Sequence, residues 1–218
     1  SKPTLAAFQN RLERSPADGN IDIVVVCNDA QMREEHDVVR EAYGDREDLP
    51  FDVTVHRNLG TTELRDVLAE PTDFLHYIGH IDEEGFDCAD GKLDAHTLDE
   101  VGTGAFFLNA CTSYEQGMSL IDAGSIGGVV TLQDVINSGA VTVGKLLARL
   151  LNRGFPLRSG LNIAAGETII GDQYMVVGDG SLSIAQAESG TPYVCEIDPD
   201  GEEFALTLVG YPSREWGM

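Results

Sequence analysis

Short apolar runs alternate with amphipathic, helical patterns along most of the chain. The runs predict strands at 21–27, 51–56, 73–78, 105–110 and 127–132, and the intervening patterns predict helices at 4–14, 31–43, 61–69, 115–123 and 138–153. Strands that alternate with helices form βαβ units, which build a parallel, doubly wound sheet. We therefore expect an α/β fold, a three-layer sandwich with a mostly parallel central sheet.

The last 45 residues show a different pattern. Short β-type segments at 174–179, 181–187, 191–198 and 203–210 are separated by Gly, Pro and Asp turns. This spacing predicts β-hairpins appended to the main body. A further hairpin is expected at 86–94, where Asp90-Gly91 forms a turn signal.

The charge of the chain is strongly negative. Its 218 residues include 37 Asp plus Glu against 14 Lys plus Arg, a formal net charge of −23. Such a field repels phosphate backbones and anionic lipid, so we expect neither nucleic acid nor membrane as a partner. The acids are scattered and only three residues are lysines. This composition favours a cytoplasmic protein of a halophilic archaeon or a similar high-salt cell.

The four cysteines show no C-x-x-C pair, and free thiols in a reducing cytosol are expected. They are Cys27, Cys88, Cys111 and Cys195. No apolar run approaches the ~18 residues that cross a bilayer. Because the chain opens at Ser1 without an initiator methionine, we expect it to be a piece of a longer protein.

Reactive side chains in a parallel sheet gather beyond the carboxyl ends of the strands. His80 and Cys111 follow the ends of two strands that are consecutive in the predicted sheet. A histidine can accept the thiol proton and later protonate a leaving amine. Backbone N–H groups of Cys111 and of the stretch from Gly79 to Ile81 are candidates to bind an acyl oxyanion. The pattern predicts a Cys-His dyad for acyl transfer.

The stretch FLHYIGHIDEEG, followed about thirty residues later by AFFLNACTS, resembles the caspase-like cysteine peptidases, and most of all the CHAT domain. Supporting pieces are the Gly-rich turn into GGVVTLQDV and Gly178-Asp179-Gly180, where relatives commonly have Gly-Asp-Pro. The resemblance spans about residues 21–185, so residues 1–218 are expected to form one domain with a hairpin extension at about 186–218.

The resemblance implies a cysteine endopeptidase with Cys111 as the nucleophile and His80 as the general base and acid. Asp134 resembles an acidic position that selects a basic side chain at P1 in separase-like relatives. The implied partners are a polypeptide substrate or partner protein and, in the full-length protein, an upstream repeat or sensor domain. No metal or organic cofactor is implied.

Two alternative functions stay open. Relatives usually place Gly directly after the catalytic His, whereas this chain has Ile81, which favours a proteolytically inactive interaction module. A flavodoxin-like domain that binds a small molecule or phosphate is the third possibility.

Several other residues have a structural interpretation. Cys27 and His76 are expected in the core and Cys88 and Cys195 in hairpins. Asn28-Asp29 could orient substrate or cap the next helix, and the cap is the preferred interpretation.

Overall fold

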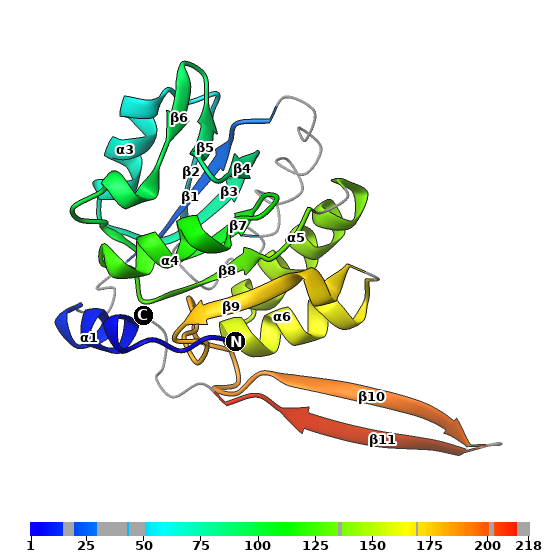
Figure 1. The fold of residues 1–218 in the computed structure, drawn as a ribbon. Helices are drawn as coiled ribbons and strands as arrows, with labels where there is room; N and C mark the ends of the chain where they lie inside the picture. The colour runs from blue at the N-terminus through cyan, green and yellow to red at the C-terminus, as the bar shows by residue number, and fades with distance from the viewer. Residues whose placement is uncertain are drawn as a thin grey trace.

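The computed structural model describes residues 1–14, 20–29, 43, 51–134, 137–168, 170–200 and 203–212. A six-stranded sheet in the order β2-β1-β3-β7-β8-β9 crosses the molecule (Figure 1). Its strands are β1 (Ile21–Cys27), β2 (Phe51–Arg57), β3 (Thr72–Ile78), β7 (Thr103–Asn109), β8 (Gly127–Thr131) and β9 (Tyr174–Gly178). Every neighbouring pair is parallel except β8 and β9. The expected mostly parallel sheet is confirmed.

Helices cover both faces of this sheet. They are α1 (Leu5–Glu13), α3 (Thr61–Ala69), α4 (Tyr114–Asp122), α5 (Asn137–Asn152) and α6 (Leu157–Gly166), with short 3-10 turns η1 (Ala95–Thr97) and η2 (Gly171–Gln173). Apolar side chains of α5 and α6 pack on one face, and those of α1, α3 and α4 pack on the other. Strand β7 is buried at every position because both of its faces are covered. The molecule is the expected three-layer sandwich.

Glycines bring helix α4 close to the sheet. A Cβ atom at Gly117 in α4 would lie 2.4 Å from Cγ1 of Val130, and one at Gly128 in β8 would lie 2.2 Å from the ring of Phe106. Such distances are far shorter than van der Waals contact. The two missing side chains therefore allow α4 and β7 to pack tightly on β8, next to the end of the strand that carries Cys111.

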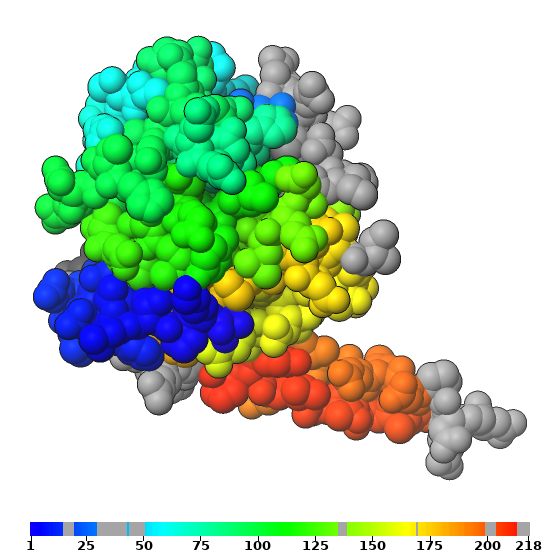
Figure 2. All heavy atoms as spheres, viewed as in Figure 1, coloured from blue at the N-terminus to red at the C-terminus, as the bar shows by residue number. Residues whose placement is uncertain are grey.

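The C-terminal part differs from the expectation in three respects. The predicted strand at 174–179 is β9, which pairs antiparallel with β8 and completes the central sheet rather than forming an appended hairpin. Residues 181–187 form no strand but a mostly buried, irregular segment. Helix α6 was not predicted from the sequence. The remaining hairpin, β10 (Tyr193–Asp200) with β11 (Glu203–Gly210), forms as expected and projects from the body (Figures 1 and 2).

A small antiparallel sheet follows directly after His80. It consists of β4 (Ile81–Asp82), β5 (Gly85–Cys88) and β6 (Gly91–Leu93). Cys88 pairs with Gly91, so the turn is centred on Ala89-Asp90, one residue earlier than the sequence suggested. The Asp90 carboxylate accepts a hydrogen bond from the backbone N–H of Thr61 at 2.7 Å, which caps α3 and fixes this small sheet on it.

The N-terminus is attached to the far edge of the sheet. Lys2 forms a β-bridge to Val177, and Arg11 in α1 makes an ion pair with the buried Asp179. Burial alone would raise the pKa of Asp179, but hydrogen bonds from Ser181 and the contact with Arg11 hold this pKa below its usual value. The Gly-Asp-Gly motif thus anchors helix α1. In the part of the chain that the structure describes, no helix is long and apolar enough to cross a membrane.

Candidate active site

His80 and Cys111 lie beyond the carboxyl ends of two adjacent strands. Ile78 at the end of β3 is paired with Asn109 at the end of β7, and each candidate residue comes two positions later. The two loops are joined by a hydrogen bond of 3.4 Å from the Thr112 hydroxyl to the carbonyl oxygen of Ile81. The His80 side chain is 58% exposed, and Cys111 is half-buried. The sheet therefore presents both residues on one rim that solvent can reach.

Asp29 provides a carboxylate beside the imidazole. It follows the end of β1, the other neighbour of β3, and its Oδ2 lies 3.3 Å from Nε2 of His80. Asp29 is itself buried, with 7% exposure. A carboxylate at this distance can orient an imidazole ring, as the acidic member of a catalytic triad does.

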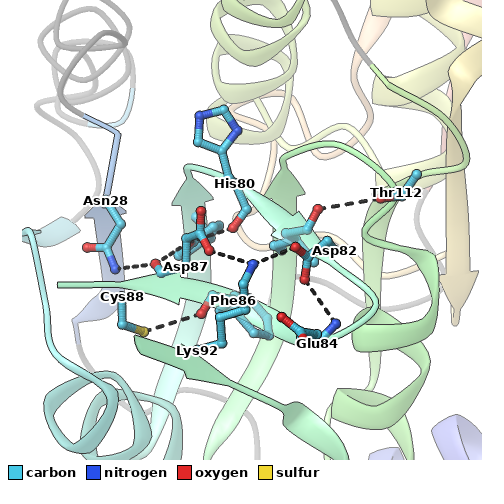
Figure 3. A network of polar contacts seen from close by, with 11 residues as sticks. Asn28, His80, Asp82, Glu84, Phe86, Asp87, Cys88, Lys92 and Thr112 are labelled. Atoms are coloured by element: carbon cyan, nitrogen blue, oxygen red, sulfur yellow. Dashed lines mark hydrogen bonds and ion pairs between the residues drawn. The ribbon is translucent and has the colours of Figure 1, made fainter. Parts of the chain in front are cut away.

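The expected helix-cap role of Asn28-Asp29 concerns a helix at 31–43, of which all but Tyr43 lies outside the described residues. What the structure shows is a different role for Asn28. Its side chain accepts a hydrogen bond from the backbone N–H of Leu59 at 2.9 Å and donates one to the carbonyl of Asp87 at 3.0 Å (Figure 3). Asn28 thus joins the end of β1 to strand β5.

The backbone carbonyl of His80 is held by the hydroxyl of a buried tyrosine, Tyr77. The Tyr77 hydroxyl donates to the carbonyl oxygens of His80 at 3.2 Å and Asp87 at 3.0 Å, and the N–H of Asp87 also donates to His80 at 3.0 Å. Burial raises the pKa of Tyr77 well above its usual value, so the hydroxyl keeps its proton as a donor. Figure 3 shows the His80 ring pointing away from this network.

Gly79 is required by the same arrangement. The tyrosine ring folds back beneath it, and a Cβ atom at Gly79 would lie 2.8 Å from the Tyr77 hydroxyl. Only glycine leaves room for this contact immediately before His80. Gly79, whose amide is a candidate donor to the oxyanion, therefore also has a steric role.

The turn that carries Cys111 is tightly fixed. Thr112 adopts a left-handed conformation with φ of 45°, which is costly for a residue with a side chain. The turn is held by reciprocal hydrogen bonds between Ser113 and Thr131 and by a hydrogen bond from Thr131 to the carbonyl of Ala110. Helix α4 begins at Tyr114, so its positive N-terminal end faces the same turn.

Ile81 is turned away from the solvent-exposed rim. It is 3% exposed and packs with Phe86 and Leu93 in the core that includes α3 and α4. The side chain of Ile81, the residue that favoured an inactive module, therefore lies in the core rather than over His80.

Asp134 lies on the other side of Cys111. Strand β8 ends at Thr131, and Asp134 follows three residues later as an exposed side chain. The carbonyl of the preceding residue, Gln133, accepts a hydrogen bond of 3.4 Å from the N–H of Thr112. The segment that carries Asp134 thus borders the turn that carries Cys111.

The remaining candidates have structural surroundings. His76 is fully buried between Tyr43 and Phe107, and burial lowers its pKa to about 3, so it is a neutral core residue. Cys27 is buried, as expected. Burial and the nearby Asp90 raise the pKa of Cys88 to about 11, which makes it a poor nucleophile near neutral pH.

Cys195 is exposed in β10. Across the described ranges, no group of three or more His, Cys, Asp or Glu side chains is arranged to hold a metal ion.

Comparison with known proteins gives a likeness of fold at low sequence identity. No protein-family model and no curated protein matches the chain. The Arg-specific cysteine proteinase gingipain R aligns with a TM-score of 0.64 at 9% identity over 88% of this chain. A complex of the pro- and mature domains of Porphyromonas gingivalis RgpB aligns with a TM-score of 0.61, also at 9% identity.

Separase of Saccharomyces cerevisiae, in its complex with securin, aligns with a TM-score of 0.59 at 12% identity over 79% of this chain. The chain spans only 13% of that separase chain and 55% of the gingipain R chain. At such identities the likeness concerns the fold alone. The six-stranded sheet, its helical layers and these neighbours show that the chain has a caspase-like fold.

Proposed function

We propose that the chain is a cysteine endopeptidase of the caspase-like type, related to the CHAT domain, with Cys111 as nucleophile and His80 as general base and acid. The observation that carries this proposal is the placement of both residues two positions beyond paired strand ends, with Asp29 3.3 Å from His80. A core histidine or a packing cysteine requires no such arrangement. The rim is also accessible, as a polypeptide substrate demands.

The mechanism follows from the roles of the three side chains. His80 takes the proton of the Cys111 thiol, and the thiolate attacks the carbonyl carbon of the scissile peptide bond. Because Asp29 contacts Nε2, the nitrogen that remains for proton exchange is Nδ1. Protonated His80 then donates to the leaving amine as the C–N bond breaks, and water hydrolyses the resulting thioester with His80 as base.

The developing oxyanion needs hydrogen-bond donors on the same rim. The backbone N–H of Cys111 and the amides of Gly79 and Ile81 are our candidates. Their support is the fixed geometry on both sides: Tyr77 holds the His80 carbonyl, and the Ser113–Thr131 pair holds the cysteine turn. A rigid backbone is what electrostatic stabilisation of a transition state requires.

Specificity for a basic residue at P1 is the finer part of the proposal. Asp134 is an exposed carboxylate beside the Cys111 turn, and a guanidinium or ammonium group is its natural complement. Gingipain R, which shares the fold, is named as an Arg-specific proteinase. The net charge of −23 also favours positively charged peptides at low ionic strength.

The experiment is a positional-scanning peptide library assayed in molar KCl, in line with the expected high-salt cytoplasm. Wild type should cleave after Arg or Lys, Cys111→Ala should be inactive, and Asp134→Asn should lose the basic preference while retaining cleavage. Asp29→Asn should lower kcat/KM by at least about tenfold, because the ring loses its carboxylate partner. Cys195→Ala is the matched control and should be fully active, since Cys195 lies in the distant hairpin.

Cleavage that persists in Cys111→Ala would refute the mechanism. Absence of cleavage by wild type, with all four thiols reacting equally slowly, would favour the alternative of a proteolytically inactive interaction module.

A further inference from the structure

The hairpin of β10 and β11 carries an uncovered apolar face. The cross-strand register places Tyr193, Cys195 and Ile197 of β10 opposite Gly210, Leu208 and Leu206 of β11. Directly opposed residues share a face of the ribbon, so this face is apolar from its base onward. Phe204 continues it toward the tip.

The other face of the hairpin has a different character. It carries Val194, Glu196 and Asp198 opposite Val209, Thr207 and Ala205. All the acidic side chains described in the middle of the ribbon therefore point to one side. Such a separation of apolar and acidic faces is typical of a sheet with one face in a core.

The described residues offer nothing that covers the apolar face. Its large side chains remain exposed to the following extents: Tyr193 57%, Ile197 59%, Phe204 71%, Leu206 65% and Leu208 69%. Strands β10 and β11 pair only with each other among the described strands, and the hairpin extends away from the body (Figures 1 and 2). A two-stranded ribbon alone is at best marginally stable in water.

We propose that this face is a dimerisation surface that packs against the same face of a second copy of the chain. Two ribbons face to face form a small two-layer sandwich, with apolar side chains between the layers and Glu196 and Asp198 outside in solvent. The residues of this face are all uncharged, so a charged partner would find no group of opposite charge: Tyr193, Cys195, Ile197, Leu206 and Leu208. Its character is self-complementary, as a two-fold interface requires.

The size of the face fits a stable dimer. With roughly 200 Å² for each large side chain, five that are exposed by more than half present roughly 600 Å² per copy. Two copies would then bury about 1,200 Å², which reaches the lower end of specific protein–protein interfaces.

Charge repulsion between the two acidic bodies is limited by the length of the hairpin. Each strand has eight residues, or about 26 Å at ~3.3 Å per residue. An antiparallel arrangement of the two ribbons places the bodies at opposite ends, several times the Debye length of ~8 Å at physiological ionic strength. The apolar contact therefore forms without bringing the bodies together.

The test is the mass of the 218-residue chain by sedimentation equilibrium at roughly 1–200 µM, a range that spans dissociation constants of micromolar order, as expected for an interface at the lower end of size. We expect a dimer for wild type and a monomer for Leu206→Asp, with the dissociation constant raised at least about tenfold. Thr207→Asp, which adds the same charge to the opposite face, is the control and should remain dimeric. Near-UV circular dichroism checks that each variant is folded.

A second measurement keeps the proposal testable if Leu206→Asp fails to fold. Cys195 lies within the apolar face, so its alkylation should slow as the wild-type concentration rises through the dimerisation range. A monomer at all concentrations in both 0.15 M and 2 M KCl, or a Leu206→Asp dimer as tight as wild type, would overturn the proposal.

Discussion

Replacing Tyr77 by Phe tests how the fold holds His80. The substitution removes one hydroxyl and keeps the ring, which packs edge-on against Phe86 with centroids 5.0 Å apart. The lost donor serves the carbonyl oxygens of His80 and Asp87. Each of these carbonyls keeps a second donor, the N–H of Asp87 for His80 and the amide of Asn28 for Asp87.

The expected loss of stability follows from the hydrogen-bond donors that remain to these two carbonyls. A buried hydrogen bond contributes about 0.5–1.5 kcal/mol, and an acceptor left wholly without a donor costs ~1–3 kcal/mol. Since neither carbonyl is left wholly without one, we expect Tyr77→Phe to lower the free energy of unfolding by about 1 kcal/mol. The loop of His80 becomes less restrained, and displacement of a catalytic group by about 1 Å costs on the order of 100-fold. With the Asp87 bond intact, we expect a loss of roughly tenfold in kcat/KM.

The matched control is Ser125→Ala. The Ser125 hydroxyl is also buried and donates to a backbone carbonyl, that of Thr103, at 2.8 Å, but at the amino end of β7, away from His80. Urea denaturation should give a similar loss of stability for both variants, and peptide cleavage should fall only in Tyr77→Phe. Equal activity of the two variants would refute the idea that Tyr77 positions His80.

Three further predictions concern stability. The pKa of Asp179 is below its usual value, so the ionised carboxylate stabilises the fold above about pH 4, and this stabilisation is lost as pH falls through the native pKa. The melting temperature of Asp179→Asn should therefore change less between about pH 5 and 3 than that of wild type. Gly128→Ala should destabilise by roughly 1–3 kcal/mol in urea, because its Cβ overlaps the ring of Phe106. Melting temperature should rise from about 0.1 M to 2 M KCl, since salt screens a net charge of −23, and a flat response would contradict this.

Much of the fold could be predicted because its strands carry a strong local signal. The run at 21–27 and helix 61–69 match β1 and α3 residue for residue. Helix α6 was missed because LRSGLNIAAG contains two glycines, which lower helix propensity. The place of β9 was missed for another reason: its partner β8 lies far earlier in the chain, and local periodicity carries no information about such pairing.

In the candidate site, too, the residues that follow from local patterns could be predicted, and those that depend on strand order could not. The order of motifs located His80 and Cys111 because strand ends are visible in the sequence. Asp29 was interpreted as a cap because Asp after a strand usually begins a helix. Its contact with His80 depends on β1 and β3 being neighbours, which the sequence does not state. The signal that could have identified Asp29 is its position directly after a predicted strand, which it shares with His80 and Cys111.

The most direct test of the Cys111–His80 pair is the alkylation rate of each thiol near neutral pH, relative to the same thiol in the chain unfolded in urea. We expect native Cys111 to react at least about tenfold faster than when unfolded, and His80→Ala to abolish this acceleration. Cys88, with a pKa of about 11, should react far more slowly than when unfolded. Native Cys111 that reacts no faster than the unfolded thiol, or that is unaffected by His80→Ala, would contradict the account.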